Sequence, residues 1–430
     1  MKKLLALFVF ITLHAAAQQP LSLQDAIGIA LKNSLNIQIS KNTVAVTTIN
    51  NDYGIAGGLP VVSLNATDVQ QSTSVNQKLN NGTQIKGYGA PSNNLNFGLS
   101  ATVPVYSGGR IVTEKKRLDE VHSQSEQQLN SRIQLVVANV MLKYFDIIRQ
   151  QSYAGTLQRS IDVSKQKLDI VKTQQSVGLA NNADLFQSQV DYNAQIQALQ
   201  AQQLVIDQGK TDLLTLLTLK ADSIVTISDT IVVDRGITLD SILNNLYINP
   251  DVIAAEQQIR INEFIEKETA SQRYPSLNFN TGANYSRNQS GLGNFLLNQS
   301  YGPFVGLSLA VPIYNGGIYK KQQQIAGINI KTSQLQKDTL LINYTANTVK
   351  NWQAYQSNLQ QLETAKQNYD LSQKLLTLVL QRFQLKQATI VDVKNAQQSF
   401  ESAGYLLVNL SYAAKAAEIQ LKRYANKLSY

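Results

Sequence analysis

One short phrase occurs twice in the sequence and limits what the chain can fold into. Val103–Arg110 reads VPVYSGGR, and Val311–Ile318 reads VPIYNGGI. An alternating apolar–polar stretch precedes each copy, and a helical pattern follows it. Proline donates no hydrogen bond to a strand ladder, and paired glycines allow the backbone to turn sharply. We therefore interpret each copy as a joint where a strand becomes a helix, in a chain with an internal two-fold sequence repeat.

The interval from each joint to the next helix break is the same in both halves. Gly108 precedes Asp184 by 76 residues, and Gly316 precedes Asp392 by 76 residues. Apolar residues recur every three or four positions across these intervals, as they do in a coiled coil. The pattern predicts two long helix hairpins, over 109–219 and 317–426.

Four β-strands are predicted, two in each half. Apolar residues alternate with small or polar ones over 95–105, which indicates a strand with one apolar face. Similar alternation predicts strands over 60–70, 275–286 and 302–313. The segment 70–94 is rich in Asn, Gly, Ser and Gln, and we expect it to be a loop.

The predicted elements divide the chain from residue 18 onward into two repeats. A helical pattern opens each repeat before its strands, over 21–57 in the first. The first repeat is expected to span 18–219 and the second 237–430. Residues 220–236 lack a helical pattern and are interpreted as a linker at the equator of the molecule.

The N-terminus predicts export. Lys2 and Lys3 form a positive region, and Leu4–Leu13 form an apolar segment too short to span a membrane as a helix. Ala15–Ala17 provides the small residues of a cleavage site. We expect a cleaved signal peptide over 1–17. No uninterrupted apolar run of about 18 residues follows it, so strands would have to make any membrane span.

Composition argues against enzymatic chemistry. The chain has no Cys, and its only histidines are His14 and His122. Thiol nucleophiles, disulfides and thiolate metal sites are therefore excluded. We expect no catalytic residue, no metal and no cofactor. The net charge of +9 comes from scattered residues without a Lys/Arg run, which disfavours a nucleic-acid partner.

The predicted strands have an apolar face that nothing else in the chain could cover. Lipid can cover such a face while water contacts the polar one, as in transmembrane β-barrels. Four strands are too few, because about eight are the minimum for an outer-membrane barrel. We therefore expect an α+β membrane protein in which several chains complete a transmembrane antiparallel β-barrel. Three chains would supply twelve strands.

The two joints contain the residues expected at the edge of the membrane. Pro104 and Pro312 are expected to stop ladder pairing. Tyr106 and Tyr314 suit the membrane–water interface, with the ring in lipid and the hydroxyl in water. The turns themselves are attributed to two glycine pairs: Gly108 with Gly109, and Gly316 with Gly317.

These features together resemble the TolC family of outer-membrane efflux proteins. The signal peptide, the duplicated helix–strand–strand–helix hairpin order and the P-x-Y-x-G-G joints carry the resemblance over nearly all of the mature chain. It implies a homotrimer in which a twelve-stranded barrel in the outer membrane continues into a long, coiled-coil-like α-helical barrel across the periplasm. It also implies a passive exit duct of a tripartite efflux or type I secretion system. The implied partners are a periplasmic adaptor (membrane fusion) protein, an inner-membrane pump and outer-membrane lipid.

The resemblance further implies two adaptor-contact tips at the helix reversals. The stretch VGLANNADLFQSQ resembles the family's first periplasmic tip, and LKQATIVDVKNAQ resembles the second. At the second tip a lysine stands where the family has its turn glycine. The residues matched are Val177, Gly178 and Leu179 in the first tip, and Leu385, Lys386 and Gln387 in the second.

A periplasmic gate is implied just past the second tip, where the family places two acidic residues. Asp392 matches the first position, but Asn395 stands at the second, so we expect a weaker cation barrier. Asp184 matches the partner position in the first half. Asp392 could instead be a helix N-terminal charge. Phe383 and Ala388 replace the latch tyrosine and arginine of the family, so other contacts would hold a closed state.

Two other functions remain open from the residues alone. A non-pore periplasmic coiled-coil scaffold or adaptor protein would fit the helices, but it needs no alternating strands. An envelope-bound hydrolase would need a nucleophile and a base. The mature chain keeps one histidine, His122, on a polar helix face.

Overall fold

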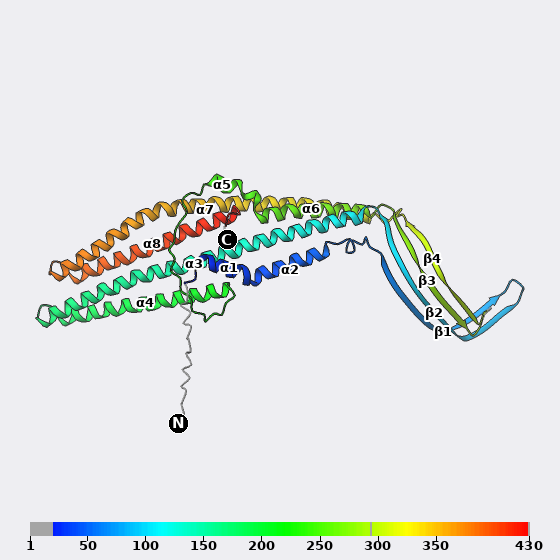
Figure 1. The fold of residues 1–430 in the computed structure, drawn as a ribbon, viewed down its shortest axis with the longest axis horizontal. Helices are drawn as coiled ribbons and strands as arrows, with labels where there is room; N and C mark the ends of the chain where they lie inside the picture. Colours follow the sequence, from blue (N-terminus) through cyan, green and yellow to red (C-terminus); the bar gives the residue numbers. More distant parts are fainter. Residues whose placement is uncertain (1–19, 293–294, 429–430) are drawn as a thin grey trace, which may run out of the picture. The chain divides into compact units, whose positions relative to one another are not determined.

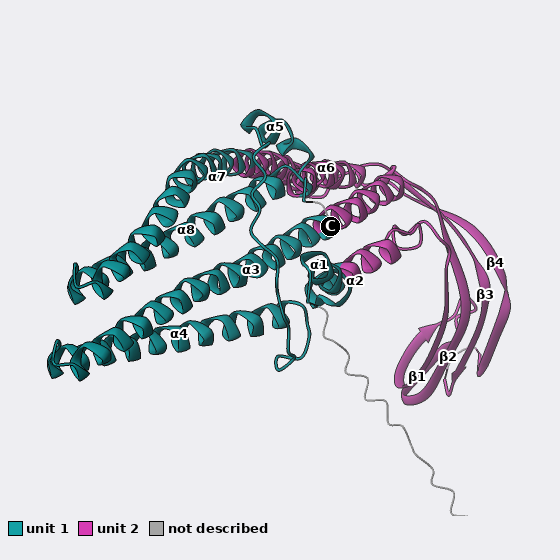
Figure 2. Cartoon of the chain, turned by 60° about the vertical axis from the view of Figure 1, so that its left-hand side comes forward, with its two compact units in different colours: residues 1–40, 129–250, 341–430 teal, residues 41–128, 251–340 magenta. Residues whose placement is uncertain are grey.

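The structure is a computed structural model that describes residues 20–292 and 295–428. The predicted signal peptide lies outside the described residues. The chain forms two compact units (Figure 2): unit 1 comprises 1–40, 129–250 and 341–430, and unit 2 comprises 41–128 and 251–340.

Helices and strands follow the same order in each half of the chain (Figure 1). Helices α3 and α7 each have 67 residues, and α4 and α8 each have 35. The first half contains α1 (Leu23–Asn33), α2 (Leu35–Asn50), β1 (Val61–Lys78), β2 (Gln84–Ser107), α3 (Arg110–Ser176) and α4 (Asn182–Leu216). The second half contains α5 (Leu239–Asn244), a 3₁₀ turn (Leu246–Ile248), α6 (Pro250–Ser271), β3 (Ser276–Ser290), β4 (Leu297–Ala310), α7 (Ile318–Gln384) and α8 (Ile390–Tyr424).

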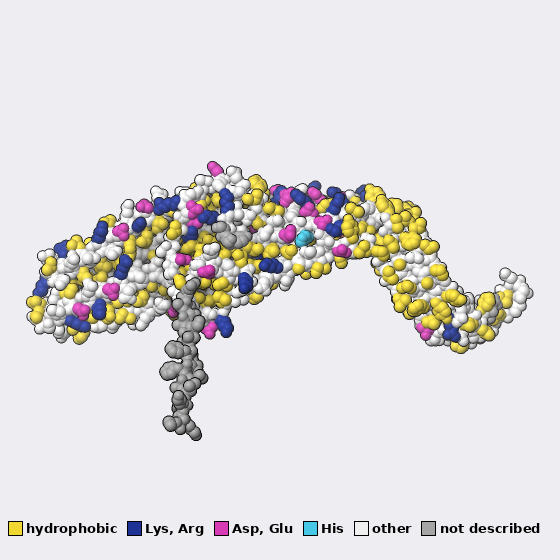
Figure 3. Space-filling model, viewed as in Figure 1, with side chains coloured by type: hydrophobic (Ala, Val, Ile, Leu, Met, Phe, Trp, Pro, Cys, Tyr) yellow, Lys and Arg dark blue, Asp and Glu magenta, His cyan; other side chains and the backbone are white. Residues whose placement is uncertain are grey.

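The four strands form one antiparallel sheet in the order β1-β2-β3-β4. The register aligns Leu64, Leu99, Ala283 and Pro303 across all four strands. Since side chains alternate along a strand, such rows make one face of the sheet predominantly apolar. The outermost strands, β1 and β4, are mostly exposed, and hydrophobic side chains gather over the strands in Figure 3.

The opposite face of the sheet carries a hydrogen-bonded set of small polar side chains. Ser63 and Ser100 share a hydrogen bond of 3.0 Å. The Thr102 hydroxyl donates to the Asn280 amide oxygen, whose amide nitrogen donates to Ser308, each at 3.0 Å. The sheet is therefore two-sided, with one apolar and one polar face.

Unit 1 has the larger apolar core. Residues of α3, including Val140, Tyr144 and Ile147, pack with α1 and with Leu213 of α4. The Tyr144 hydroxyl donates to the Leu21 carbonyl at 2.8 Å and to the Asp229 carboxylate at 2.5 Å. Burial, followed by the hydrogen bond to Asp229, raises the pKa of Tyr144. These contacts attach the segments around Leu21 and Asp229 to α3.

Several polar contacts join the helices of unit 2. Gln124 of α3 donates to Gln258 of α6 at 3.0 Å, and Lys337 of α7 contacts Glu256 of α6 at 2.6 Å. Gln323 donates to Glu266 at 2.7 Å. Among the described residues, no helix is both long and apolar enough to cross a membrane.

Several predicted boundaries are wrong. The segment 70–94 is not a loop, because β1 extends to Lys78 and β2 begins at Gln84. Backbone pairing of the hairpin continues there although the side chains no longer alternate. The strand predicted over 302–313 spans Leu297–Ala310 instead. The helix predicted over 21–57 is interrupted at Ser34, where ψ is 119°.

Candidate functional site

The first helix reversal is a tight turn built around Gly178. Gly178 has a φ of 76°, which favours glycine because a Cβ atom would crowd the backbone. Its N–H donates to the Gln175 carbonyl at 3.0 Å, and the Leu179 N–H donates to the Gln174 carbonyl at 2.7 Å. This is the Schellman arrangement that ends many helices. It leaves the side chains of Val177 and Leu179 exposed.

The second reversal has the same geometry, with a lysine in the glycine position. Lys386 has a φ of 58° and donates its N–H to the Phe383 carbonyl at 3.1 Å. The Gln387 N–H donates to the Arg382 carbonyl at 2.8 Å. Leu385 is 69% exposed. The turn therefore forms without glycine, but Lys386 adopts a conformation that costs a side-chain-bearing residue about 1 kcal/mol or more.

The acidic residues after both turns lie in helix caps. Asn181 caps α4 by accepting the Asp184 N–H at 2.8 Å. Thr389 and Asp392 form a reciprocal capping box at the start of α8, with bonds of 3.2 and 2.8 Å. The backbone N–H and then the hydroxyl of Thr389 lower the pKa of the Asp392 carboxyl. Asp392 therefore takes part in capping the N-terminus of α8.

Asp392 and Asn395 are both exposed, whereas Val393 between them is buried. Val393 packs with Phe383 and with Val171 of α3 in one apolar cluster. Ala388 lies at the edge of this cluster. Phe383 and Ala388, which stand where the resemblance implies latch residues, thus both belong to an apolar cluster.

A buried ion pair beside this cluster was missed from the sequence. The Lys167 ammonium of α3 contacts the Asp191 carboxylate of α4 at 2.6 Å, and its side chain is 1% exposed. Lys394 of α8 contacts the same carboxylate at 3.5 Å. Burial alone would raise the pKa of Asp191, but hydrogen bonds and charges, chiefly those of Lys167, hold it below its ordinary value. Lys167 and Asp191 both lie twelve residues from Leu179, so the hairpin symmetry could have revealed them.

Both strand–helix joints turn on glycines in the left-handed region. The φ angles are 64° at Gly108, 84° at Gly109, 68° at Gly316 and 73° at Gly317. At Gly108 there is a second constraint, because a Cβ atom would lie 2.7 Å from the Ser271 carbonyl oxygen. Only glycine fits at that position without displacing the backbone of α6.

The proline at the first joint does not act as expected. Pro104 still aligns with Asn278, and pairing resumes at Tyr106 after an irregularity at Val105, so β2 continues past the proline. A bulge accommodates a residue that lacks an N–H. Pro312 lies beyond the end of β4. Tyr106 and Tyr314 are both exposed.

No metal centre is apparent in the described part of the chain, where no three His, Asp or Glu side chains gather as ligands. The features that stand out are instead the two apolar-tipped helix turns, the joints and the two-faced sheet.

Comparisons with known proteins identify the family. A family model described as outer membrane efflux protein matches residues 26–218 and 242–427. No curated protein sequence matches the chain significantly.

Solved structures agree with this match. The chain aligns with the CusC channel at 17% identity and a TM-score of 0.77, over 95% of this chain and 92% of that one. VceC of Vibrio cholerae aligns at 17% identity and a TM-score of 0.76, over 95% of this chain and 97% of that one. CmeC of Campylobacter jejuni aligns at 14% identity and a TM-score of 0.76, over 94% of this chain and 85% of that one. The resemblance inferred from the sequence is confirmed, and members of this family are channels rather than enzymes. The chain belongs to the outer membrane efflux protein family.

Proposed function

We propose that this protein is the outer-membrane exit duct of a tripartite efflux or type I secretion system. The observation that carries the proposal is the two-faced sheet, whose apolar rows are exposed on strands with open edges. Val305, Leu307 and Leu309 of β4 are all more than 60% exposed. Contact with water is energetically unfavourable for such an apolar surface, whereas contact with lipid is favourable.

The proposed assembly is a homotrimer with a twelve-stranded barrel. The unpaired edges of β1 and β4 would join between neighbouring chains, since a barrel leaves no free edge. Exposed apolar residues on α2 and α7 repeat at spacings of three, four and seven, as at coiled-coil seams. Their pairing between chains would close the helical barrel. These residues are Leu35, Ile39, Val46 and Ile49 on α2, and Ile325, Ile328, Leu335 and Ile342 on α7.

In this proposal the chain is exported by a cleaved signal peptide and folds as two repeats. The repeats, 18–219 and 237–430, are joined by the linker 220–236. The equal lengths of α3 and α7, and of α4 and α8, support a duplication. The strands lie in the outer membrane, the joints face its periplasmic side and the helix hairpins extend into the periplasm.

The helix turns are the proposed adaptor contacts. Val177, Leu179 and Leu385 are exposed apolar side chains on turns that backbone hydrogen bonds hold rigid. Such preformed apolar tips suit a helical hairpin of a periplasmic adaptor, which an inner-membrane pump would share. The proposed entrance residues are Asp392 and Asn395, with Asp184 in the first half. One acidic ring in place of two would give weaker cation selectivity.

Loss of the gene in its own cell tests this function. We expect sensitisation to a class of dyes, detergents, antibiotics or metal ions, or loss of a secreted protein, with reversal on re-expression. Gly178→Leu should weaken the reversal while membrane insertion stays normal, because the φ at this turn disfavours a side chain. A Gly178→Leu protein with full export activity would argue against adaptor contact at this turn.

A further inference from the structure

A small cationic cavity lies at the second strand–helix joint, entirely within unit 2. It has a volume of about 220 Å³ and lies between the end of α6 and the start of α7. Its lining includes Arg273, Ile313, Tyr314, Asn315, Tyr319 and Lys320. Two cations and two tyrosines thus border one recess beside the end of β4.

The two cations of this cavity have no carboxylate partner among the described residues. Arg273 and Lys320 are both exposed. The sequence contains no Asp or Glu from Thr269 to Lys337. The acids that precede this stretch have other partners, since Glu268 binds Arg117 at 2.7 Å and Glu266 accepts from Gln323. The recess therefore has a net positive charge.

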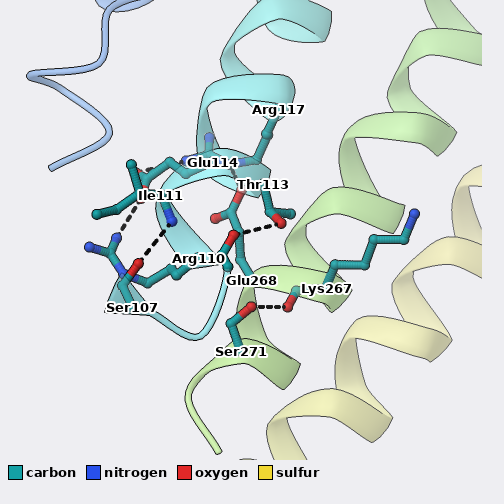
Figure 4. A network of polar contacts seen from close by, with 10 residues as sticks. Ser107, Arg110, Ile111, Thr113, Glu114, Arg117, Lys267, Glu268 and Ser271 are labelled. Carbon is teal, nitrogen blue, oxygen red and sulfur yellow. Dashed lines mark hydrogen bonds and ion pairs between the residues drawn. The ribbon is translucent and has the colours of Figure 1, made fainter. Parts of the chain in front are cut away.

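The first joint, in contrast, neutralises its own cations (Figure 4). Arg110 contacts Glu114 at 2.5 Å, and Arg117 contacts both Glu114 and Glu268. Counting from the glycine pair, the position of Lys320 is occupied there by Val112. The unpaired charge at the second joint is thus not a requirement of the strand-to-helix turn itself.

An exposed apolar row leads directly to the cationic cavity. Val305, Leu307 and Leu309 alternate along β4, and the spacing continues through Val311 to Ile313, which is 95% exposed. Ile313 lines the cavity, and the neighbouring Tyr314 is 87% exposed. Apolar surface, aromatic rings and cations therefore follow one another along a few residues. A phospholipid leaflet has matching layers in the same order: acyl chains against the apolar surface, the membrane–water interface at the aromatic rings, and phosphate groups at the cations.

We propose that this cavity binds the phosphate group of a glycerophospholipid in the periplasmic leaflet of the outer membrane. This inference rests on the proposed function, which places the strands in that membrane. The Arg273 guanidinium and the Lys320 ammonium donate to the phosphate oxygens, and the tyrosine hydroxyls can add hydrogen bonds. The acyl chains lie along the β4 row that ends at Ile313. One lipid per chain is held at the second joint and none in the same way at the first.

Native mass spectrometry of the full-length protein in detergent tests the proposal, with phosphatidylglycerol as the probe. A diacylglycerol with the same acyl chains but no phosphate serves as one comparison, and inorganic phosphate as another. We expect the double variant Arg273→Gln with Lys320→Gln to lose roughly tenfold or more in phosphatidylglycerol affinity. The control Lys331→Gln, an exposed cation elsewhere on α7, should bind as the wild type does.

Each result decides the proposal. Equal phosphatidylglycerol binding by the double variant and the wild type would overturn it, as would equal binding of the diacylglycerol. Displacement of the lipid by millimolar inorganic phosphate would identify a site for free phosphate instead. If the double variant does not fold, Arg273→Lys with Lys320→Arg must retain binding while Lys320→Gln alone loses it. A wild-type protein that fails to insert into vesicles contradicts the proposed function as well, whereas insertion without a cation-dependent lipid contradicts only this inference.

Discussion

At the scale of single residues, Lys386 departs from an unstrained backbone at the second helix reversal. It adopts the same left-handed conformation as Gly178 at the equivalent turn. We predict that Lys386→Gly increases the stability of this turn by about 1 kcal/mol, because glycine removes the steric cost. Amide hydrogen exchange at the second tip should slow about fivefold. The control Lys374→Gly, inside α7, should instead destabilise its helix by about 1 kcal/mol; faster exchange in Lys386→Gly would contradict the prediction.

Gly108 and Gly316 provide a matched pair of substitutions. Their φ angles are nearly equal, but a Cβ atom at Gly108 would also meet the Ser271 carbonyl, whereas none lies near at Gly316. Gly108→Ala should therefore lower the thermal unfolding midpoint more than Gly316→Ala does, by an additional amount equivalent to about 1–2 kcal/mol. Equal midpoints in the two variants would show that the backbone of α6 moves away from the added Cβ atom without a loss of stability.

The ion pair of Lys167 and Asp191 predicts an acid dependence. Because the folded pKa of Asp191 is below its ordinary 3.8, the stability it contributes is complete above that value and is lost as the pH falls through the folded pKa. Asp191→Asn should cost about 3 kcal/mol at neutral pH, since it leaves the Lys167 charge buried without its partner. Replacing both residues, as Lys167→Met with Asp191→Leu, should restore most of the loss. Unfolding midpoints between pH 3 and pH 7 measure both effects.

At the scale of elements, a second buried carboxylate holds the linker against α8. Glu418 accepts the Asp234 N–H at 2.9 Å and contacts Lys415 and Lys422 at the same distance, with its side chain 2% exposed. Asp234 also accepts from the Tyr355 hydroxyl through its carbonyl. Within unit 1, the linker thus attaches to α7 and α8 through one acidic side chain and a small number of partners.

Glu418→Gln is expected to loosen this attachment by about 3 kcal/mol, because Lys415, whose side chain is largely buried, loses its counter-charge, while Lys422 keeps only Asp234. The only tryptophan, Trp352, packs beside Tyr355 with a ring separation of 5.6 Å and lies in the same cluster as Val233 of the linker. Its fluorescence should therefore shift toward longer wavelength as water enters. An unchanged spectrum and an unchanged unfolding midpoint would show that the linker is held by its apolar contacts instead.

The sequence predicted the kinds of elements well but their ends less well. Period-two and heptad patterns report which faces are apolar, and these patterns located the strands, the joints and both helix reversals. The polar extension of β1 to Lys78 could not be read in this way, because backbone pairing without alternating side chains leaves no periodic signal. The break at Ser34 was also missed, since the apolar spacing continues through it. Buried Lys167 leaves no local signal because its partner is supplied by the returning helix, and only the equal distance of the two residues from the turn indicates the pair.

At the scale of the whole molecule, the proposed helical seam between chains gives a prediction of its own. Leu335 is 67% exposed in the single chain, at a position expected to pack against α2 of a neighbour. Leu335→Glu should reduce the trimer fraction in detergent while leaving the helix content unchanged, because a charge at a seam position is costly only when it is buried. The control is Lys331→Gln, one helical turn away, which should leave the trimer fraction unchanged. Light scattering of the purified protein gives the mass of each variant.

Cross-linking of the two edge strands tests the central claim most directly. The chain contains no cysteine, so Val62→Cys in β1 can be combined in turn with Val305→Cys, Leu307→Cys or Leu309→Cys in β4 without background. If three sheets close one barrel, at least one pair should form covalent dimers and trimers in outer membranes under mild oxidation, and Val62→Cys alone should yield no trimer. Monomers from every pair, with all the cysteines still open to alkylation, would contradict a barrel shared between chains.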